Sequence, residues 1–228
     1  MYQLFIANKL YSSWSLRPWI LMRELDIPFT EQVVPFASDS NWEEFRRFSP
    51  VGKVPCLHDA ETVIWDSMGI IEYLADRFPE VWPKEAKARA WARCAAAEMH
   101  SGFQNLRNAC GMHISLRIKM NQVSAAVQRD IERINELWNE GLSRFGGPFL
   151  AGDKFTAIDA FFAPVVFRVQ TYGLKMDAPS TAYAQHILAL PSMQLWQADA
   201  LKEEWSEPNH ELEAKAAGEV IEDKRKAQ

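Results

Sequence analysis

The pattern of short apolar runs changes once along this chain of 228 residues, and that change most constrains its fold. Before residue 79, strand-like runs alternate with helical segments, whereas beyond residue 87 the strand signals fade and helical periodicity dominates. Between the two parts, residues 79–87 (PEVWPKEAK) carry two prolines and mixed charge, as linkers do. The pattern predicts an α/β domain at 1–80 and an all-α domain at 81–228.

The first part has seven segments in the order β-α-β-α-β-β-α. Strands are expected at 2–7, 29–34, 54–59 and 62–66, the last two as a hairpin, and helices at 15–26, at 41–48 and from Ser67 to just before Pro79. In the first helix, the periodicity puts Trp19 and Ile20 on the apolar side and Arg17 on the outer side. This order predicts a small α/β layer with a mixed sheet.

The second part is expected to be helical throughout. Helices are expected at 86–119, 122–145, 156–172, 181–189 and 192–205. Thr156 and Asp159 have the spacing of a capping box, in which side chains satisfy free N–H groups at a helix start. The segment at about 206–228 is charged and contains no Phe, Tyr or Trp, so we expect a frayed tail.

Composition excludes several classes of protein. The formal net charge of −5 leaves no basic footprint for nucleic acid. No apolar stretch approaches the roughly 20 residues of a membrane helix, and the N-terminus lacks the basic segment of a signal peptide. Three widely spaced cysteines (Cys56, Cys94 and Cys110) give neither zinc spacing nor a disulfide framework. These features predict a cytoplasmic protein without a metal site.

A serine-rich corner, LYSSWSLRPWI at 10–20, marks the start of the first helix. With Ser15 as the N-cap, Pro18 falls at the third helical position, where its missing N–H costs no hydrogen bond. Ser12 and Ser13 then precede the helix, whose N-terminus stabilises an anion. The serines could instead only cap the helix. A nucleophilic serine is disfavoured, because no GxSxG turn surrounds it.

Four motifs together resemble the glutathione transferase superfamily. SSWSLR at 12–17 resembles the helix start of the zeta class in particular, and VP at 54–55 resembles the family's cis-proline segment. DS at 66–67 resembles its γ-glutamyl-binding pair, and TAID at 156–159 its capping box. The resemblance implies a thioredoxin-like N-terminal domain, an all-helical C-terminal domain, a homodimer, and glutathione as co-substrate.

The resemblance also implies roles for particular residues. The anion at the serine corner would be the glutathione thiolate, with Ser12 or Ser13 as its hydrogen-bond donor. Glutathione would be bound by Lys53, Val54, Pro55, Asp66 and Ser67. In that set, the backbone of Val54 would pair with the cysteinyl part, while Ser67 would hold the γ-glutamyl carboxylate and Asp66 its ammonium group. Whether Pro55 is cis is left open by the sequence.

The second substrate is expected to be a small hydrophobic electrophile. Candidate residues for its site are Trp14, His100, Phe103, Arg107 and Arg168. The middle three can share one helical face, although core packing or a subunit interface would also explain them. Arg168 either meets a substrate carboxylate or only caps the core. Zeta-class enzymes, which include maleylacetoacetate isomerase, have Cys where this chain has Trp14, and a flat indole wall favours aromatic electrophiles over a small di-acid.

Three alternatives stay open at this point. The protein could be a non-catalytic relative that binds ligands or partner proteins, or it could act like maleylacetoacetate isomerase. Thiol–disulfide exchange would need a cysteine thiolate at the helix start, and residues 8–18 contain none.

Overall fold

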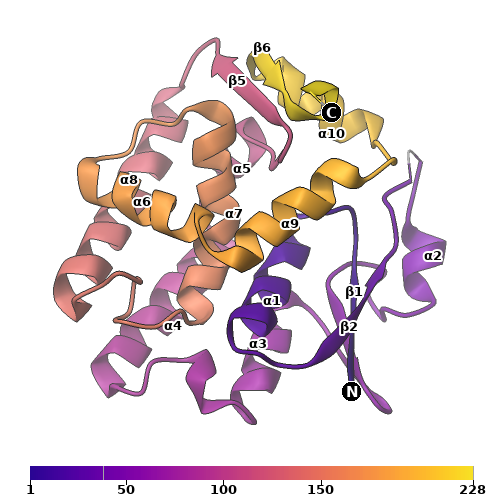
Figure 1. Cartoon of the computed structure of the whole chain (residues 1–228), viewed down its shortest axis with the longest axis vertical. Coiled ribbons are helices and arrows are strands. Elements are labelled where there is room, and N and C mark those ends of the chain that lie inside the picture. The colour runs from indigo at the N-terminus through magenta and orange to yellow at the C-terminus, as the bar shows by residue number, and fades with distance from the viewer. Residues whose placement is uncertain (38, 228) are drawn as a thin grey trace.

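A four-stranded sheet and a bundle of helices lie side by side in the computed structural model, which describes residues 1–37 and 39–227 (Figure 1). The N-terminal layer comprises β1 (Tyr2–Ile6), α1 (Ser13–Glu24), β2 (Phe29–Val33), α2 (Trp42–Arg46), β3 (Cys56–Asp59), β4 (Thr62–Ile64) and α3 (Ser67–Ala75). The strands are ordered β2-β1-β3-β4, with β1 and β2 parallel and the other pairs antiparallel. The predicted thioredoxin-like α/β layer is confirmed.

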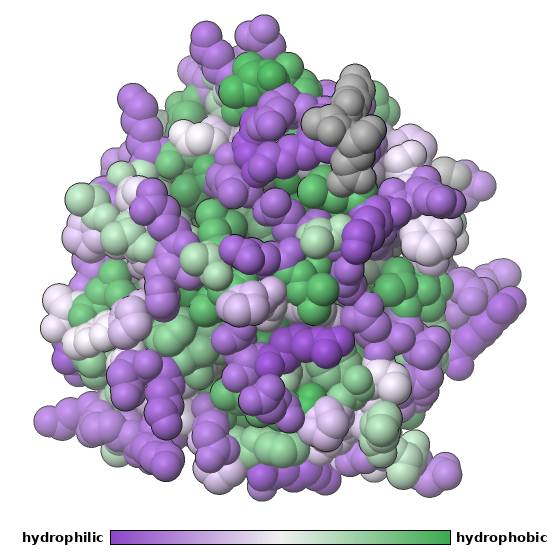
Figure 2. Space-filling view, viewed as in Figure 1, coloured by the Kyte–Doolittle hydropathy of each residue, from purple (hydrophilic) through white to green (hydrophobic). Residues whose placement is uncertain are grey.

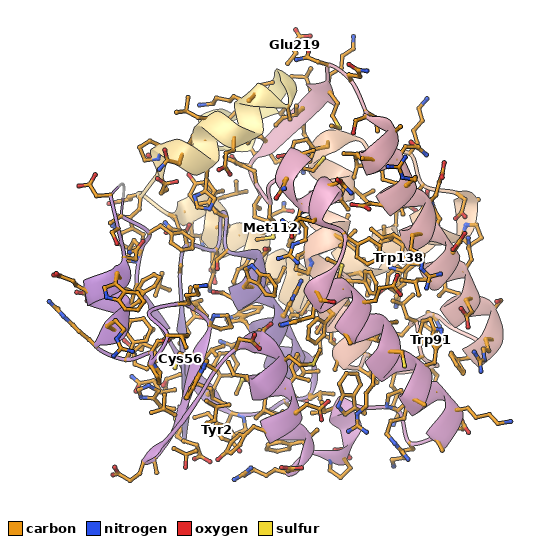
Figure 3. All side chains as sticks on the ribbon, turned by 180° about the vertical axis from the view of Figure 1, so that it is seen from behind. Tyr2, Cys56, Trp91, Met112, Trp138 and Glu219 are labelled. Atoms are coloured by element: carbon orange, nitrogen blue, oxygen red, sulfur yellow. The ribbon has the colours of Figure 1, made fainter. Side chains whose placement is uncertain are left out.

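The helical domain is built around α7. It comprises α4 (Ala86–Ser101), α5 (Gln104–Ala109), α6 (Ala125–Phe145), α7 (Ala157–Tyr172), α8 (Ala178–Leu188), α9 (Pro191–Lys202) and α10 (Pro208–Ala216), after a short 3₁₀ turn, η1 (Pro79–Val81). The α7 helix is buried along nearly its whole length and packs against α1, α4 and α8. On α6, Trp138 is fully buried, and its ring meets those of Phe162 and Tyr183 edge-on (Figure 3). The predicted helical second domain is thus confirmed, and the packing of α1 on α7 joins it to the N-terminal layer.

The capping box at the start of α7 is confirmed. The Asp159 carboxylate accepts hydrogen bonds from the N–H of Thr156 at 3.0 Å, the N–H of Leu150 at 3.0 Å and the hydroxyl of Tyr183 at 3.0 Å. Burial raises the pKa of Asp159 to about 6, although these hydrogen bonds oppose the rise. The beginning of α7, the helix on which α1 packs, is therefore fixed by the Asp159 carboxylate together with its three hydrogen-bond donors.

The helix predicted over 86–119 is wrong in its second half. The chain leaves α4 at Gly102 and restarts as α5 after Phe103, whose φ of 56° is left-handed. A Cβ atom at Gly102 would lie 2.7 Å from the carbonyl oxygen of Glu98, so glycine permits this exit. Beyond α5, β5 (Leu116–Met120) is a strand, because it pairs with β6 (Gly218–Asp223) from the chain's end.

The prediction of a frayed tail is also wrong. The tail forms α10, β6 and a 3₁₀ turn, η2 (Lys224–Ala227), and it folds back along β5 (Figure 1). Glu211 on α10 accepts hydrogen bonds from the Tyr11 hydroxyl at 2.8 Å, from Nε2 of His113 at 2.9 Å and from Nη1 of Arg225 at 2.7 Å. The tail is held in place by charge-assisted hydrogen bonds and by the pairing of β6 with β5. Neither can be predicted from composition alone.

On the face of the molecule in Figure 2, hydrophilic and hydrophobic residues are interspersed rather than gathered into one apolar area. Within the described residues, none of the helices combines the length and the apolar character that crossing a bilayer requires.

We predict that Glu211→Gln loosens the tail and lowers the free energy of unfolding by about 1.5–3 kcal/mol at neutral pH, the cost of losing a hydrogen bond to a charged group. Burial raises the pKa of Glu211, but hydrogen bonds from His113, Arg225 and Tyr11 outweigh burial and hold it well below its usual range. The carboxylate therefore stabilises the fold above the unfolded pKa of about 4.3, and this contribution fades as pH falls below that value.

Urea unfolding of the natural protein and of Glu211→Gln, at pH 7 and at lower pH, measures the difference in their free energies of unfolding. Glu213→Gln, an exposed position on the same helix, is the matched control and should change little. Equal stability of the Glu211→Gln and Glu213→Gln proteins at pH 7 would refute the role given to Glu211.

Candidate active site

The first helix begins earlier than the sequence analysis expected. Ser12, rather than Ser15, occupies the N-cap position, and α1 starts at Ser13. The first turn closes when the N–H of Leu16 donates to the carbonyl oxygen of Ser12 at 3.2 Å. Pro18 consequently lies inside the helix and not in its first turn, which removes one backbone hydrogen bond. Both predicted serines now stand at the N-terminus of α1.

The two serines differ in what holds them. Ser12 is 4% exposed, and its Oγ lies 2.7 Å from Oγ of Ser15 in a buried hydrogen bond. Oγ of Ser15 also accepts from the N–H of Ala7, at the end of β1, at 3.3 Å. Ser13 is half-buried and has no such support in the described structure. The Ser12 hydroxyl is therefore the better positioned of the two, and Ser15 positions it.

Tyr11, next to these serines, uses its hydroxyl in a hydrogen bond to the C-terminal segment. The hydroxyl of Tyr11 donates to Glu211, and the tyrosine ring stacks on His210. Burial and the Glu211 carboxylate raise the pKa of Tyr11. Its phenol is thus engaged with the C-terminal segment, which leaves the serines as the hydroxyl donors at this corner.

The start of α3 provides a second group of polar atoms. Asp66 is the N-cap, and its Oδ1 accepts from the N–H groups of Met68 at 2.9 Å and Gly69 at 3.3 Å. Oδ2 of Asp66 lies 3.3 Å from Nε2 of His100. Ser67 is fully buried, and its hydroxyl finds no hydrogen-bond partner among the described residues. A buried free hydroxyl at a helix N-terminus suits a carboxylate.

The segment before β3 has the backbone state that the family resemblance suggested. The Val54–Pro55 peptide bond is cis, and Pro55 is buried directly ahead of the strand. Lys53 is exposed, and its N–H lies 3.4 Å from Oγ of Ser49.

Cationic side chains gather around the half-buried indole of Trp14. The guanidinium carbons of Arg17 and Arg107 lie 4.1 and 4.4 Å from its ring centre, and the His100 ring meets it edge-on at 5.3 Å. Burial lowers the pKa of His100, and the Asp66 carboxylate opposes that shift. The expected flat apolar wall therefore exists, but two guanidinium groups pack over it.

The other candidates for the second substrate separate into two groups. Arg107 reaches the site because the break at Gly102 brings its Nη1 within 3.2 Å of the carbonyl oxygen of His100. Phe103 is buried in the core, so the shared helical face expected for these residues is absent. Arg168 is buried too, and it donates through Nε to the carbonyl oxygen of Cys110 at 2.8 Å and through Nη1 to that of Pro164. Phe103 thus packs in the core, and Arg168 mainly donates hydrogen bonds to the backbone there.

Sequence analysis misplaced one site residue, Arg17. The side chain was expected on the outer face of α1, yet it is 2% exposed and lies between Trp14 and Phe161, 4.9 Å from the latter ring centre. Its Nε and Nη1 atoms are buried without a hydrogen-bond partner in the described structure. The three-residue spacing from Trp14 to Arg17 was the available signal, since such residues share a helix face.

Two further observations concern metal binding and the position of a large cleft relative to the predicted site residues. In the described ranges, no group of three or more His, Cys, Asp or Glu side chains could hold a metal ion. A cleft of about 1110 Å³ opens between the linker and the loop that follows α6, and none of the predicted site residues lines it.

Comparison with known families now identifies the chain. The profile of the glutathione S-transferase N-terminal domain matches residues 11–77, and that of the C-terminal domain matches residues 121–189. The two matches together cover more than half of the chain, which belongs to the glutathione S-transferase family. It is a glutathione transferase, an enzyme with glutathione as its co-substrate, as the family resemblance implied.

Individual relatives agree with the family. Glutathione S-transferase Z2 of Arabidopsis thaliana is 29% identical over 69% of this chain and 74% of its own. A probable maleylacetoacetate isomerase of Caenorhabditis elegans is 26% identical over 72% of this chain and 77% of its own. Among solved structures, a Burkholderia glutathione transferase homologue with bound glutathione has a TM-score of 0.68 at 21% identity, covering 89% of this chain and 99% of that one. At that identity, the structure supports the fold.

Proposed function

We propose that this enzyme ionises the glutathione thiol at the start of α1 and directs the thiolate to an electrophile beside Trp14. One observation carries the proposal, the buried Ser12 hydroxyl at the helix N-terminus. Oγ of Ser12 donates to Oγ of Ser15 in this structure. Because a hydroxyl rotates, Ser12 would turn its hydrogen to the sulfur when glutathione binds, and Ser15 would then donate to the oxygen of Ser12. The charged form of the thiol is then favoured by a fixed donor and by the helix dipole.

The energies involved are of the right size. A free thiol has a pKa of about 8.5, so only a small fraction is ionised at neutral pH. Lowering that pKa by about two units takes roughly 2.7 kcal/mol of differential stabilisation. A hydrogen bond to a charged group supplies about 1.5–3 kcal/mol, and a helix N-terminus adds about 0.3–1 kcal/mol. Ser12 and α1 together therefore suffice.

The body of glutathione would lie along the N-terminal layer. The free hydroxyl of Ser67 would hold the γ-glutamyl carboxylate, and Oδ2 of Asp66 the ammonium group. The backbone of Val54 would pair with the cysteinyl part, with Pro55 turning that backbone towards the ligand, and Lys53 would meet the glycyl carboxylate. Binding at both ends leaves the sulfur between Ser12 and the C-terminal domain.

The reaction then needs no nucleophile from the protein. The thiolate attacks the electrophilic carbon of an aryl halide, the C–S bond forms, and the halide leaves with the electron pair of the bond that breaks. The thiol proton has already passed to solvent. The enzyme contributes an activated thiolate and its orientation towards a planar electrophile beside Trp14.

We expect Ser12→Ala to raise the apparent thiol pKa of the enzyme–glutathione complex by about 1–2 units, towards the free value of about 8.5, because the fixed donor is lost. The pH dependence of conjugation to an aryl halide and the ultraviolet absorbance of the bound thiolate both measure this pKa. Ser15→Ala should give a smaller rise in the same direction, since it removes only the support of Ser12.

Ser13→Ala is the matched control, because Ser13 neighbours Ser12 without its buried hydrogen bond. The proposal names Ser12, so a pKa that moves with Ser13→Ala alone would transfer the role to Ser13. A pKa that moves with neither substitution would refute activation at this corner.

Ser67→Ala is expected to weaken glutathione binding by about 1–3 kcal/mol and to leave the thiol pKa of the saturated complex unchanged. Protein stability should hardly change, because the hydroxyl makes no hydrogen bond within the described structure. Calorimetric titration measures the affinity, with Ser101→Ala on the exposed side of α4 as the control. Normal glutathione affinity of Ser67→Ala would rule out its role.

The second candidate function is cis–trans isomerisation of a maleyl di-acid. The guanidinium groups around Trp14 favour it, as does the similarity to a protein named as a probable maleylacetoacetate isomerase. The Trp14 ring opposes it, because the ring narrows the place where zeta-class enzymes carry a cysteine.

We predict conjugation of an aryl halide and little isomerisation of maleylacetone, both assayed at one glutathione concentration. Efficient isomerisation that persists in the Trp14→Ala protein would contradict this prediction and make the chain an isomerase.

A further inference from the structure

Among the described residues, no counter-ion contacts the buried guanidinium of Arg17. Two of its nitrogens are fully buried and unpartnered in the described structure, and its guanidinium carbon lies 4.1 Å from the ring centre of Trp14 and 4.9 Å from that of Phe161. Aromatic faces attract a cation, yet they accept no conventional hydrogen bond from it. A guanidinium in such a place is expected to pair with an anion, because burying an unpaired charge is costly.

The neighbouring charges add to this cost. Burial and the like charges of Arg107 and Arg168 all lower the pKa of Arg17, and Asp66 opposes them. The Asp66 carboxylate is held by Met68, Gly69 and His100, and no ion pair with Arg17 forms. Arg168 is turned to backbone carbonyls, whereas Arg107 is half-buried and shares the Trp14 ring with Arg17. The guanidinium groups of Arg17 and Arg107, both over the Trp14 ring, are therefore suited to bind an anion.

We propose that Arg17 and Arg107 bind a carboxylate carried by the electrophile, so that the preferred second substrate is a planar aromatic electrophile bearing a carboxylate. The inference rests on the proposed function, because it concerns what the thiolate attacks. A guanidinium offers a fork of N–H donors that matches a carboxylate, and its planar face stacks on an aromatic ring. Neutral aromatic electrophiles would fill the site and leave the cations unpaired.

Glutathione itself is the competing source of a carboxylate. Its γ-glutamyl carboxylate is assigned to Ser67 and its glycyl carboxylate to the Lys53 side, both in the N-terminal layer. Arg17 instead faces Phe161 on α7 and shares Trp14 with Arg107 on α5, both helices of the C-terminal domain. The second substrate would approach this position from the side of the C-terminal domain, whereas Asp66, which contacts His100 beside Trp14, borders it on the glutathione side.

A matched pair of aryl chlorides tests the proposal. 4-Chloro-3,5-dinitrobenzoate carries the carboxylate, and 4-chloro-3,5-dinitrobenzamide is its neutral counterpart of nearly the same shape. In both, the thiolate forms a C–S bond at the carbon that loses chloride. The measured quantity is kcat/KM for the benzoate divided by kcat/KM for the benzamide, each first divided by its uncatalysed rate constant. We expect this ratio to be about 10 to 100 for the natural enzyme.

Variants locate the effect. Arg17→Met should lower the ratio at least about tenfold, and Arg17→Lys should restore part of it, since lysine keeps the charge but lacks the fork. Arg107→Gln, at a half-buried position that tolerates change more readily, should lower the ratio about threefold or more. Arg93→Gln, on the exposed side of α4, is the control and should leave both rates unchanged.

Each other outcome overturns the proposal. A ratio near one in the natural enzyme would show that the carboxylate is not recognised, whatever the folding of the variants. An equal fall for both substrates in Arg17→Met and Arg107→Gln, with a raised thiol pKa, would place the cations on the thiolate. An equal fall with a raised KM for glutathione would place them on a glutathione carboxylate. Absence of catalysis with both chlorides would instead refute the proposed function itself.

Discussion

The anchoring of the loop between β1 and α1 is the constraint on which the whole site depends. Glu203, near the end of α9, accepts a hydrogen bond from the N–H of Lys9, and Glu211 accepts one from the hydroxyl of Tyr11. Lys9 is itself buried, and its ammonium group pairs with Glu31 and Asp199. Except for Glu31, these partners lie 190 to 200 positions later in the chain, so the C-terminal segment fixes where α1 begins. The Ser12 hydroxyl is thus placed by the folding of both domains.

Electrostatics at this corner explains why the substrates supply the anions. The N-terminus of α1, the N–H groups at the start of α3 and the guanidinium groups on Trp14 are all positive, and Asp66 is the negative side chain that faces them. In a partly buried site, such fixed donors act more strongly than they would in water. In the proposed function, a thiolate and carboxylates would complete the charge balance when the substrates bind, and the protein would provide their positions in advance.

The sequence predicted those parts of the molecule that local pattern determines. The four strands of the N-terminal sheet, the capping box at Asp159 and the residues at both helix starts follow from periodicity and short motifs, whereas β5 and β6 do not. Arg17 was misplaced because α1 lies between the sheet and α7 and is therefore buried on nearly all sides, so a charge does not mark its solvent face. The ordered tail arises from tertiary contacts that no local pattern encodes. The break after α4 has a local signal in Gly102, which the helical periodicity of the segment outweighed in the prediction. The homodimer and the cytoplasmic location stay predictions.

The structure of the enzyme crystallised with glutathione tests the central claim most directly. The account predicts the sulfur within hydrogen-bond distance of Oγ of Ser12, on the side facing Trp14, with the γ-glutamyl carboxylate on the hydroxyl of Ser67. It also predicts that the Ser12–Ser15 hydrogen bond of 2.7 Å is retained in the complex. A sulfur bound to Ser13 or Tyr11 and distant from Ser12, or glutathione lying in the cleft beside the linker, would contradict the account.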